Sequence, residues 1–395
     1  MYLTSFIHRE DLFDITQRWL YGRLEPEDGL LITQILICDG FVLGETLKTM
    51  SNLLLEIIHD GPFQNEYIHF KGELRDAICS SAQGINPRID ELIHHYKNNP
   101  DFFYKEAPVN GVVCLDRERH FLGFYRIKRP RRIAEKANRY IANWIFRMVQ
   151  ARAHKMAEER ARKLGIPIEK LLTPIEEMAR EFTDAEGIIA GRFKEGTIEL
   201  DRSSLTIHDV GGIKIVGDDE RLLHLERMLR DHPTIKIVYK ERYLGNYQAN
   251  SLILEVFWNK EHICRRYKET RAWNKYLNRG IPEEELQKGL EPLLDGTKPT
   301  INIELIFSTL PDMVESELGS SIHEERIIAQ RNNKVYKGYI PMNVEFLIEY
   351  LFALGLSPRI SVDSLPIKLW GRYLPDTISS HIRELYHIPE YSGFY

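Results

Sequence analysis

The sequence predicts an α/β protein of the α+β type, in which a mostly helical N-terminal region precedes a domain built on a mixed β-sheet. Apolar residues recur at helical spacing through most of the first 105 residues and again from 134 to 182. After residue 185 the apolar residues no longer recur at helical spacing but alternate as in strands, and these β-rich runs are interrupted by an amphipathic helix. This order is typical of a sheet that is covered by helices.

Length and composition limit the number of domains and the kinds of protein that this chain can be. The chain has 395 residues, 43% of them apolar and 28% charged, with a net charge of −5. At roughly 150 residues per domain, two or three folded domains are expected, and a protein that coats nucleic acid with an overall basic surface is disfavoured. The four cysteines form no CxxC pair, which favours a reducing cytoplasm. The apolar run at 29–42 is shorter than the roughly 20 residues of a membrane span, so we expect a cytoplasmic protein without a membrane partner.

The expected N-terminal domain covers residues 1–133. Its helical character is carried by apolar residues at helical spacing, namely Leu47, Met50, Leu54 and Ile58. Near 109–128, two β-rich runs, Val109–Leu115 and His120–Ile127, flank a polar turn and predict a β-hairpin.

A run of basic residues lies at the junction between the two expected domains. It consists of Arg126, Lys128, Arg129, Arg131, Arg132, Lys136 and Arg139. Such a run is either the solvated start of a helix or a patch that binds phosphates, and the sequence leaves both interpretations open.

The expected second domain covers residues 134–330 and contains the sheet. Strands are predicted within 186–200, 205–218, 234–242, 250–258 and 301–309, with helices at Asp218–Asp231 and from Pro311 onward. In the first of these helices, Leu222, Leu225, Met228 and Leu229 are expected to face inward. A charged insertion occupies about 258–300, and residues 331–395 form a C-terminal helical and irregular extension.

Several common catalytic signatures are absent from the sequence. There is no GxxxxGK[ST] loop, no GxGxxG, no HExxH and no GxSxG, which disfavours ordinary ATPases, Rossmann dehydrogenases, zincins and α/β hydrolases. Two carboxylates instead fall on predicted strands, Asp209 at the start of one and Glu304 inside another. Each is either a solvent-facing residue or half of a magnesium site. Arg192 and Lys194, expected on one face of a strand, either contact phosphate or decorate an exposed surface.

The order of these elements resembles the RelA/SpoT-type nucleotidyltransferase domain. That family makes (p)ppGpp by moving pyrophosphate from ATP to the 3′-hydroxyl of GTP or GDP. Its motifs are an RxK strand, a DxxGxR strand, a helix, a strand ending near a lysine, a GYRSLH turn and an ExQIRT strand. The resemblance covers about 185–325 and depends more on element order than on identical residues.

The resemblance implies roles for particular residues of this sequence. Arg192 and Lys194 match the RxK cations, Asp209 and Lys214 match DxxGxR, and Lys240 falls on the strand that ends near a lysine. Tyr247 matches the tyrosine that stacks on guanine. Glu304 matches the first residue of ExQIRT, which implies that Asp209 and Glu304 hold Mg²⁺ and that Glu304 activates the acceptor hydroxyl. A shift of two residues in the last strand would place Asn302 there instead.

The departures from the family pattern concern the cations. Lys214 replaces an arginine, Gln248 replaces the arginine after the tyrosine, and Ser308 stands at the arginine of the last motif. Lysine and glutamine do not reproduce the bidentate phosphate contacts of a guanidinium. The expected activity is therefore Mg²⁺-dependent pyrophosphate or nucleotidyl transfer from ATP to GTP, GDP or an RNA 3′-end. The alternative is a catalytically inactive fold that acts as a nucleotide sensor or a protein-interaction module. The oligomeric state, including a homo-oligomer, is left open.

Overall fold

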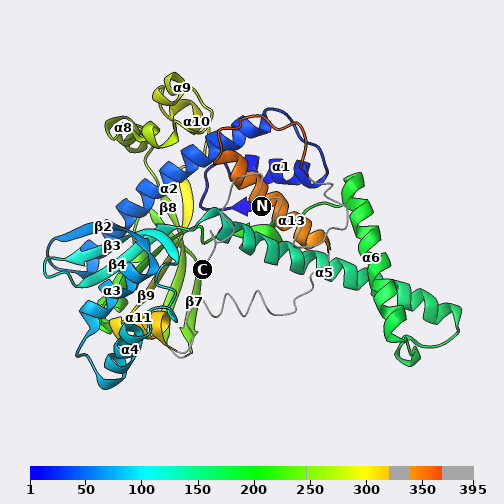
Figure 1. Cartoon of the computed structure of the whole chain (residues 1–395), viewed down its shortest axis with the longest axis horizontal. Helices are drawn as coiled ribbons and strands as arrows, with labels where there is room; N and C mark the ends of the chain where they lie inside the picture. The colour runs from blue at the N-terminus through cyan, green and yellow to red at the C-terminus, as the bar shows by residue number, and fades with distance from the viewer. Residues whose placement is uncertain (246, 320–338, 367–395) are drawn as a thin grey trace.

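A computed structural model describes residues 1–245, 247–319 and 339–366 (Figure 1). The longer helices are α1 (Arg9–Leu20), α2 (Asp28–Ile58), α3 (Lys71–Ala82), α4 (Pro87–Asn98), α5 (Pro130–Lys163), α6 (Ile175–Glu195), α7 (Asp219–Arg230), α8 (Lys260–Glu269), α11 (Leu310–Leu318) and α13 (Tyr339–Gly355). Short helical segments are η1 (Ile168–Lys170), η2 (Ser203–Leu205), η3 (Ala272–Tyr276), α9 (Glu283–Gln287) and α10 (Glu291–Leu294). The strands are β1 (Tyr2–Leu3), β2 (Phe63–Phe70), β3 (Pro108–Asp116), β4 (Phe121–Ile127), β5 (Thr206–Ile207), β6 (Gly211–Val216), β7 (Ile235–Leu244), β8 (Gln248–Phe257) and β9 (Thr300–Ser308).

The centre of the fold is a seven-stranded mixed sheet with the order β2-β3-β4-β6-β9-β8-β7. Only β6 and β9 run parallel, and the other neighbours are antiparallel. The predicted combination of a mixed sheet with a helical N-terminal region is confirmed. The hairpin predicted near 109–128 is also confirmed, as β3 and β4.

The sheet is continuous across the domain boundary that the sequence predicts at residue 133. Strands β2, β3 and β4 precede that residue, and the other four strands follow it. β4 pairs antiparallel with β6, with Arg126 opposite Gly212 and Phe124 opposite Lys214. The hairpin therefore belongs to the same sheet as the residues that resemble the nucleotidyltransferase domain.

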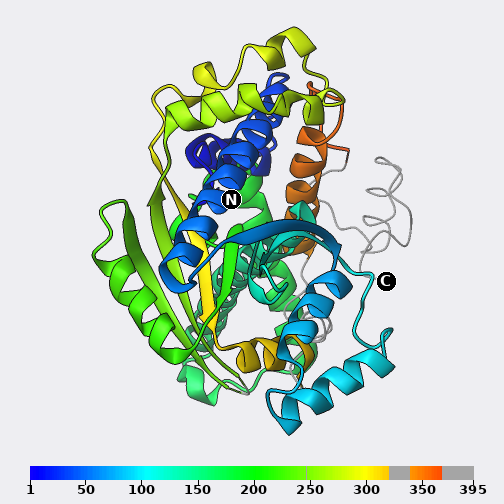
Figure 2. The same cartoon turned by 90° about the vertical axis from the view of Figure 1, so that its left-hand side faces the viewer.

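The two faces of the sheet differ in polarity because side chains alternate along each strand. One face is apolar: Ile213, Leu252 and Leu305 belong to the large core that also contains residues of α2 and α7. On the other face, Lys214 and Glu304 stand on neighbouring strands. At the β2–β4 end of this second face, Phe124 and Val113 pack with residues of α3, α4 and α11. Figure 2 shows the curved sheet with α2 crossing it.

Helix α2 packs closely on the apolar face. A Cβ on Gly211 would lie 2.7 Å from Leu43 Cδ1, so a larger residue at this position would require the Leu43 side chain to shift. Among the described residues, α2 is the one helix long and apolar enough to cross a membrane, and core helices of soluble proteins meet the same criterion. Leu47, Met50, Leu54 and Ile58 on this helix are buried.

Two expectations about secondary structure and packing are wrong. The strand predicted at 186–200 is the C-terminal part of helix α6 and the loop after it. Ala185, Ile189 and Phe193 are buried at a spacing of four residues, and Gly196 ends the helix in a left-handed conformation. Met228 of α7 is exposed, whereas Leu222, Leu225 and Leu229 are buried. The predicted helix beginning at Pro311 is present as α11, and its continuation beyond residue 319 lies outside the described residues, as does the end of the C-terminal extension.

Candidate functional site

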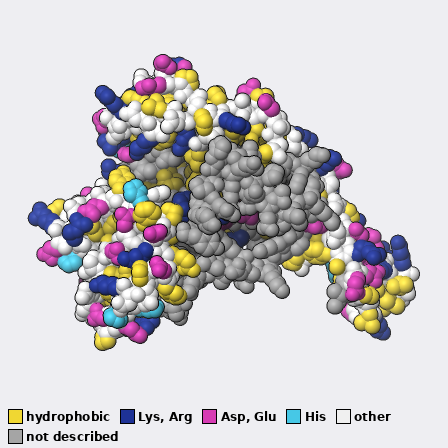
Figure 3. Space-filling view, in the orientation of Figure 1, with side chains coloured by type: hydrophobic (Ala, Val, Ile, Leu, Met, Phe, Trp, Pro, Cys, Tyr) yellow, Lys and Arg dark blue, Asp and Glu magenta, His cyan; other side chains and the backbone are white. Residues whose placement is uncertain are grey.

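A basic cavity of about 530 Å³ lies over the polar face of the sheet. Its walls come from the start of α3, β4, the start of α5, β6, β7, β8, β9 and α11. The charged and aromatic lining residues are the cations Lys71, Arg126, Lys128, Arg132, Lys136, Arg139 and Lys214, the acids Asp209, Glu304 and Glu317, and the tyrosines Tyr140, Tyr243 and Tyr247. The cavity is therefore cationic although the chain as a whole is acidic. On the outer face in Figure 3, by contrast, basic and acidic side chains of the described residues are interspersed.

Asp209 and Glu304 meet in this cavity although 95 positions separate them in the chain. Asp209 lies two residues before β6 rather than within it, and Glu304 stands opposite Gly212 in the parallel pairing of β6 with β9. The ammonium group of Lys128 donates a hydrogen bond to Asp209 Oδ2 and lies 3.6 Å from Glu304 Oε2. One cation thus contacts both carboxylates, so that the two acidic groups face the same point.

The charge of Asp209 is stabilised by two ammonium groups. Lys136 donates to the same Oδ2 atom as Lys128. Burial alone would raise the pKa of Asp209, but the two lysines outweigh it and hold this pKa below its ordinary value. Asp209 is therefore ionised at neutral pH.

The donor set suits a hard divalent cation. Asp209 Oδ1 is buried and has no hydrogen-bond partner among the described residues. A carboxylate oxygen in this condition is costly unless a cation or donor reaches it. Carboxylate oxygens are the ligands that Mg²⁺ prefers, and Glu304 supplies a second carboxylate in the same cavity. Asp209 and Glu304 therefore fit the magnesium site that the resemblance implies.

A second buried carboxylate, that of Glu317, also lines the cavity. Glu317 of α11 is 2% exposed and accepts hydrogen bonds from Lys71 at 2.9 Å and Lys214 at 2.8 Å. Burial alone would raise the pKa of Glu317, but Lys214, Lys71 and Arg75 hold it well below its ordinary value. This carboxylate fixes two ammonium groups, one from α3 and one from β6, at the cavity wall.

Two tyrosines close the side of the cavity nearest β7. Tyr247 lies in the turn between β7 and β8, and its ring centroid is 6.3 Å from that of Tyr243. Burial, together with the charges of Glu241 and Glu304, raises the pKa of Tyr243 to about 12. Tyr247 therefore presents an aromatic ring to the cavity, as expected for the residue matched to the stacking tyrosine.

Three residues assigned to the site from the sequence lie elsewhere. Arg192 and Lys194 are in the last turn of α6, are exposed, and do not line the cavity. Their expected strand is a helix, so the alternation that would have placed them on one sheet face does not exist. Lys240 on β7 lies 2.6 Å from Glu226 of α7, with which it forms an exposed pair, and it too lies outside the cavity lining.

The cations that reach the carboxylates were present in the sequence but were not assigned to the site. Arg126 and Lys128 lie at the end of β4, two residues apart, and both line the cavity. The backbone amide of Lys128 donates to the carbonyl of Val210, which continues the ladder beyond β4 and holds Lys128 beside Asp209. The sequence feature that could have identified them is the R-x-K spacing of Arg126 and Lys128, which lies within the basic run and at the end of the predicted hairpin.

The choice between Glu304 and Asn302 is resolved by their surroundings. Asn302 is buried, its side chain lies 3.5 Å from the ring of His208, and it does not line the cavity. Its backbone amide donates to the carbonyl of Thr4 in the N-terminal segment. Of these two residues, Glu304 is therefore the one that lines the cavity.

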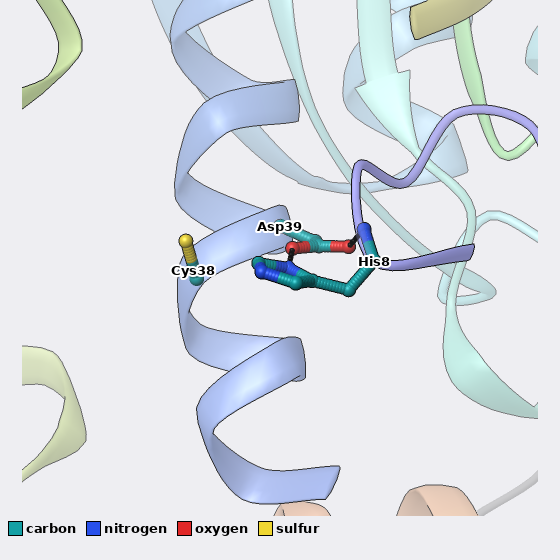
Figure 4. Close-up of side chains that lie close together, drawn as sticks. All are labelled: His8, Cys38 and Asp39. Carbon is teal, nitrogen blue, oxygen red and sulfur yellow. Dashed lines mark hydrogen bonds and ion pairs between the residues drawn. The ribbon is translucent and has the colours of Figure 1, made fainter. Parts of the chain in front are cut away.

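A separate cluster joins His8, Cys38 and Asp39, whose potential ligand atoms lie within 4.8 Å of one another (Figure 4). Both ring nitrogens of His8 are already engaged, Nδ1 with Asp39 Oδ1 at 2.5 Å and Nε2 with the carbonyl of Leu293 at 2.7 Å. Burial raises the pKa of Cys38 well above its ordinary value, so its thiol stays protonated. The cluster links the N-terminal segment, α2 and the insertion, and it does not fit a metal site.

No family model matches the chain, and no significant match is found among curated proteins or solved structures.

Proposed function

We propose that this protein transfers a pyrophosphate or nucleotidyl group from ATP to the hydroxyl of an acceptor nucleotide or RNA 3′-end in a Mg²⁺-dependent reaction. The observation that carries the proposal is the meeting of Asp209 and Glu304 at a single ammonium group, inside a cavity lined by seven cations. Paired carboxylates among cations are what magnesium-dependent phosphoryl and nucleotidyl transfer requires.

The order of the cavity residues along the chain supports the same proposal. Arg126 at the end of β4 and Lys128 directly after it supply an R-x-K pair, Asp209 and Lys214 follow just before and within β6, and Glu304 lies on the neighbouring strand β9. Tyr247 occupies the turn before β8. With Arg126 and Lys128 as the R-x-K pair the order still follows the RelA/SpoT-type motifs, and these two cations line the cavity whereas Arg192 and Lys194 do not.

In the proposed reaction, the cations bind and orient the triphosphate of ATP. Arg126 at the end of β4 and Arg132 and Arg139 on α5 line the wall across which the phosphates would lie. Lys214, held by its hydrogen bond to Glu317, lines the same cavity and offsets further negative charge of the phosphates. Mg²⁺ held by Asp209 and Glu304 would offset the charge that develops on the phosphate oxygens.

The chemical step then needs one proton acceptor. For pyrophosphate transfer, the acceptor oxygen forms a bond to the β-phosphorus of ATP, the bond from that phosphorus to the α-phosphate oxygen breaks, and AMP leaves with the electron pair. Glu304 accepts the proton of the acceptor hydroxyl, since its carboxylate faces the cavity beside Asp209. Tyr247 provides an aromatic surface on which a base of the acceptor can stack.

The proposal is tested with labelled ATP and Mg²⁺, incubated with the full chain and either GTP, GDP or bulk tRNA. We expect a labelled acceptor in at least one of these mixtures. Glu304→Gln removes the proton acceptor and one carboxylate charge, so the rate should fall by at least about 100-fold, within the range expected for loss of a general base.

The matched control is Glu226→Gln, which makes the same chemical change on α7, outside the cavity lining. It should leave the rate unchanged. A labelled product that survives Glu304→Gln would refute the role given to Glu304. Binding of ATP to the wild-type protein without transfer to any acceptor would favour the alternative function, a nucleotide sensor or protein-interaction module.

A further inference from the structure

The side chain of Lys128 occupies the bridging position between the two carboxylates of the site. Its ammonium donates to Asp209 Oδ2 and lies 3.6 Å from Glu304 Oε2. The three side chains are 20%, 12% and 17% exposed, so solvent screens this contact only in part. Among the ion pairs of the described residues, Lys136 pairs with Asp209, whereas Lys128 pairs with both carboxylates.

A divalent cation at the same carboxylates needs the oxygens that Lys128 now contacts. Mg²⁺ binds oxygen at about 2.0–2.1 Å, closer than an ammonium group can approach, and it would repel a positive charge left between the two acids. The ammonium and the metal ion therefore compete for one position. Asp209 Oδ1, which is buried without a partner among the described residues, adds an oxygen that only the incoming cation would use.

Lys128 can leave this position without unfolding its strand. It directly follows β4, and the backbone bond to Val210 holds its main chain, so moving the ammonium group requires only rotations within the four-carbon side chain. Arg126, Arg132 and Arg139, cations of the kind that bind phosphate, line the same cavity. A phosphate group would accept the ammonium as the metal ion takes its place.

We propose that Lys128 is a placeholder cation that competes with a divalent metal ion for Asp209 and Glu304 and so lowers the metal affinity of the nucleotide-free protein. The inference deepens the proposed function, on which its biological meaning rests. By linkage, a ligand that draws Lys128 away from the carboxylates raises the metal affinity, and the metal raises the affinity for that ligand by the same factor.

The test is a titration of the full chain with Mn²⁺ in the absence of nucleotide, with free Mn²⁺ measured by electron paramagnetic resonance. Lys128→Met keeps the length and apolar stem of the side chain and removes the charge. We expect this variant to bind Mn²⁺ at least about tenfold more tightly than the wild-type protein. Adding Asp209→Asn to the Lys128→Met variant should abolish the gain, because the gain depends on that carboxylate.

The matched control is Arg132→Met, which removes one positive charge from the same cavity. Arg132 pairs with Glu135, and within the described part of the chain it forms no ion pair with Asp209 or Glu304. Its effect on Mn²⁺ affinity should be much smaller than that of Lys128→Met. Equal gains in the two variants would show a general charge effect and overturn the proposal, as would a Lys128→Met protein with unchanged or weaker Mn²⁺ binding.

Circular dichroism and urea unfolding of each variant establish that the native fold is kept. The readout is metal binding rather than turnover, so the two proposals fail separately. A protein without transfer activity can still show the tenfold gain, and an active protein can still lack it.

Discussion

At the scale of single residues, buried charge is tolerated only where partners converge on it. Asp209 meets two ammonium groups and Glu317 meets Lys71 and Lys214, which compensates for the loss of water around each carboxylate. In both cases the partners come from elements that are distant in the sequence. The charges therefore become stable only once the sheet, α3, α5 and α11 are assembled.

His8 is the residue whose titration should be visible in the stability of the protein. Burial lowers its pKa, but the hydrogen bond and charge of Asp39, together with the carbonyl of Leu293, outweigh burial and raise the pKa above its ordinary value of 6.5. A raised folded-state pKa means that the stabilisation is fully present below pH 6.5 and is lost as the pH rises through the folded-state value.

We therefore expect His8→Gln to lower the free energy of unfolding most at pH 6, by about 1–3 kcal/mol, and progressively less toward pH 9. Urea unfolding at several pH values provides the measurement. His94→Gln on the exposed surface of α4 serves as the control and should show no such trend. A difference between wild type and His8→Gln that stays constant from pH 6 to pH 9 would contradict this account of His8.

At the scale of secondary structure, regular periodicity was sufficient for most elements. The spacing of Leu222, Leu225 and Leu229 predicts α7, and Asp218 caps it by accepting a hydrogen bond from the amide of Arg221. The β-rich runs predict β7, β8 and β9. These elements are specified locally, because their apolar residues repeat with a clear period and their ends carry turn or cap residues.

Helix α6 shows where local reasoning failed. Its last turns contain Gly187 and Gly191, and the pair Ile188–Ile189 interrupts a simple amphipathic pattern, so the segment resembled a strand. Burial of Ile189 and Phe193 in the shared core favours the helix. Tertiary packing outweighed the weak local preference for a strand. Because a strand was expected here, Arg192 and Lys194 were placed in the expected site.

The placement of β4 and α6 predicts which cations matter for the proposed activity. Arg126→Met should lower the rate of transfer by about 10- to 100-fold, because it removes a guanidinium from the cavity wall. Arg192→Met makes the same change on the exposed end of α6 and should alter the rate less than about twofold. Steady-state rates with saturating Mg²⁺ and ATP compare the two. If the rate fell more in Arg192→Met than in Arg126→Met, the phosphates would have to bind near α6 and not beside β4.

At the scale of the whole molecule, one sheet joins the two halves that the sequence divides at residue 133. Strand β4 of the hairpin pairs with β6. Lys136, near the start of α5, contacts Asp209, which lies just before β6. The N-terminal segment also contacts β9, where the amide of Asn302 donates to the carbonyl of Thr4. The cavity is thus shared by residues from both sides of the predicted boundary.

A fragment of residues 134–330 should therefore not fold as an independent unit. It lacks β2, β3 and β4, so β6 becomes the exposed edge of the remaining sheet, and an exposed edge strand promotes aggregation. Expression of this fragment beside the full chain, followed by gel filtration and circular dichroism, tests the expectation. A monomeric fragment that unfolds cooperatively would show that residues 134–330 form a domain without the hairpin.

The sequence by itself determined the α/β class, the hairpin, most strands and the acidic residues Asp209 and Glu304 as the pair to examine. Those features depend on period, turn residues and the cost of a carboxylate among apolar neighbours, all of which are local properties of the chain. Only the tertiary structure decided that Lys128 and Lys136 contact Asp209, and that Arg192, Lys194 and Lys240 lie elsewhere. The physical reason is that contacts between charges depend on which strands pair, and the pairing of β4 with β6 is set by burial of the whole sheet rather than by any local pattern.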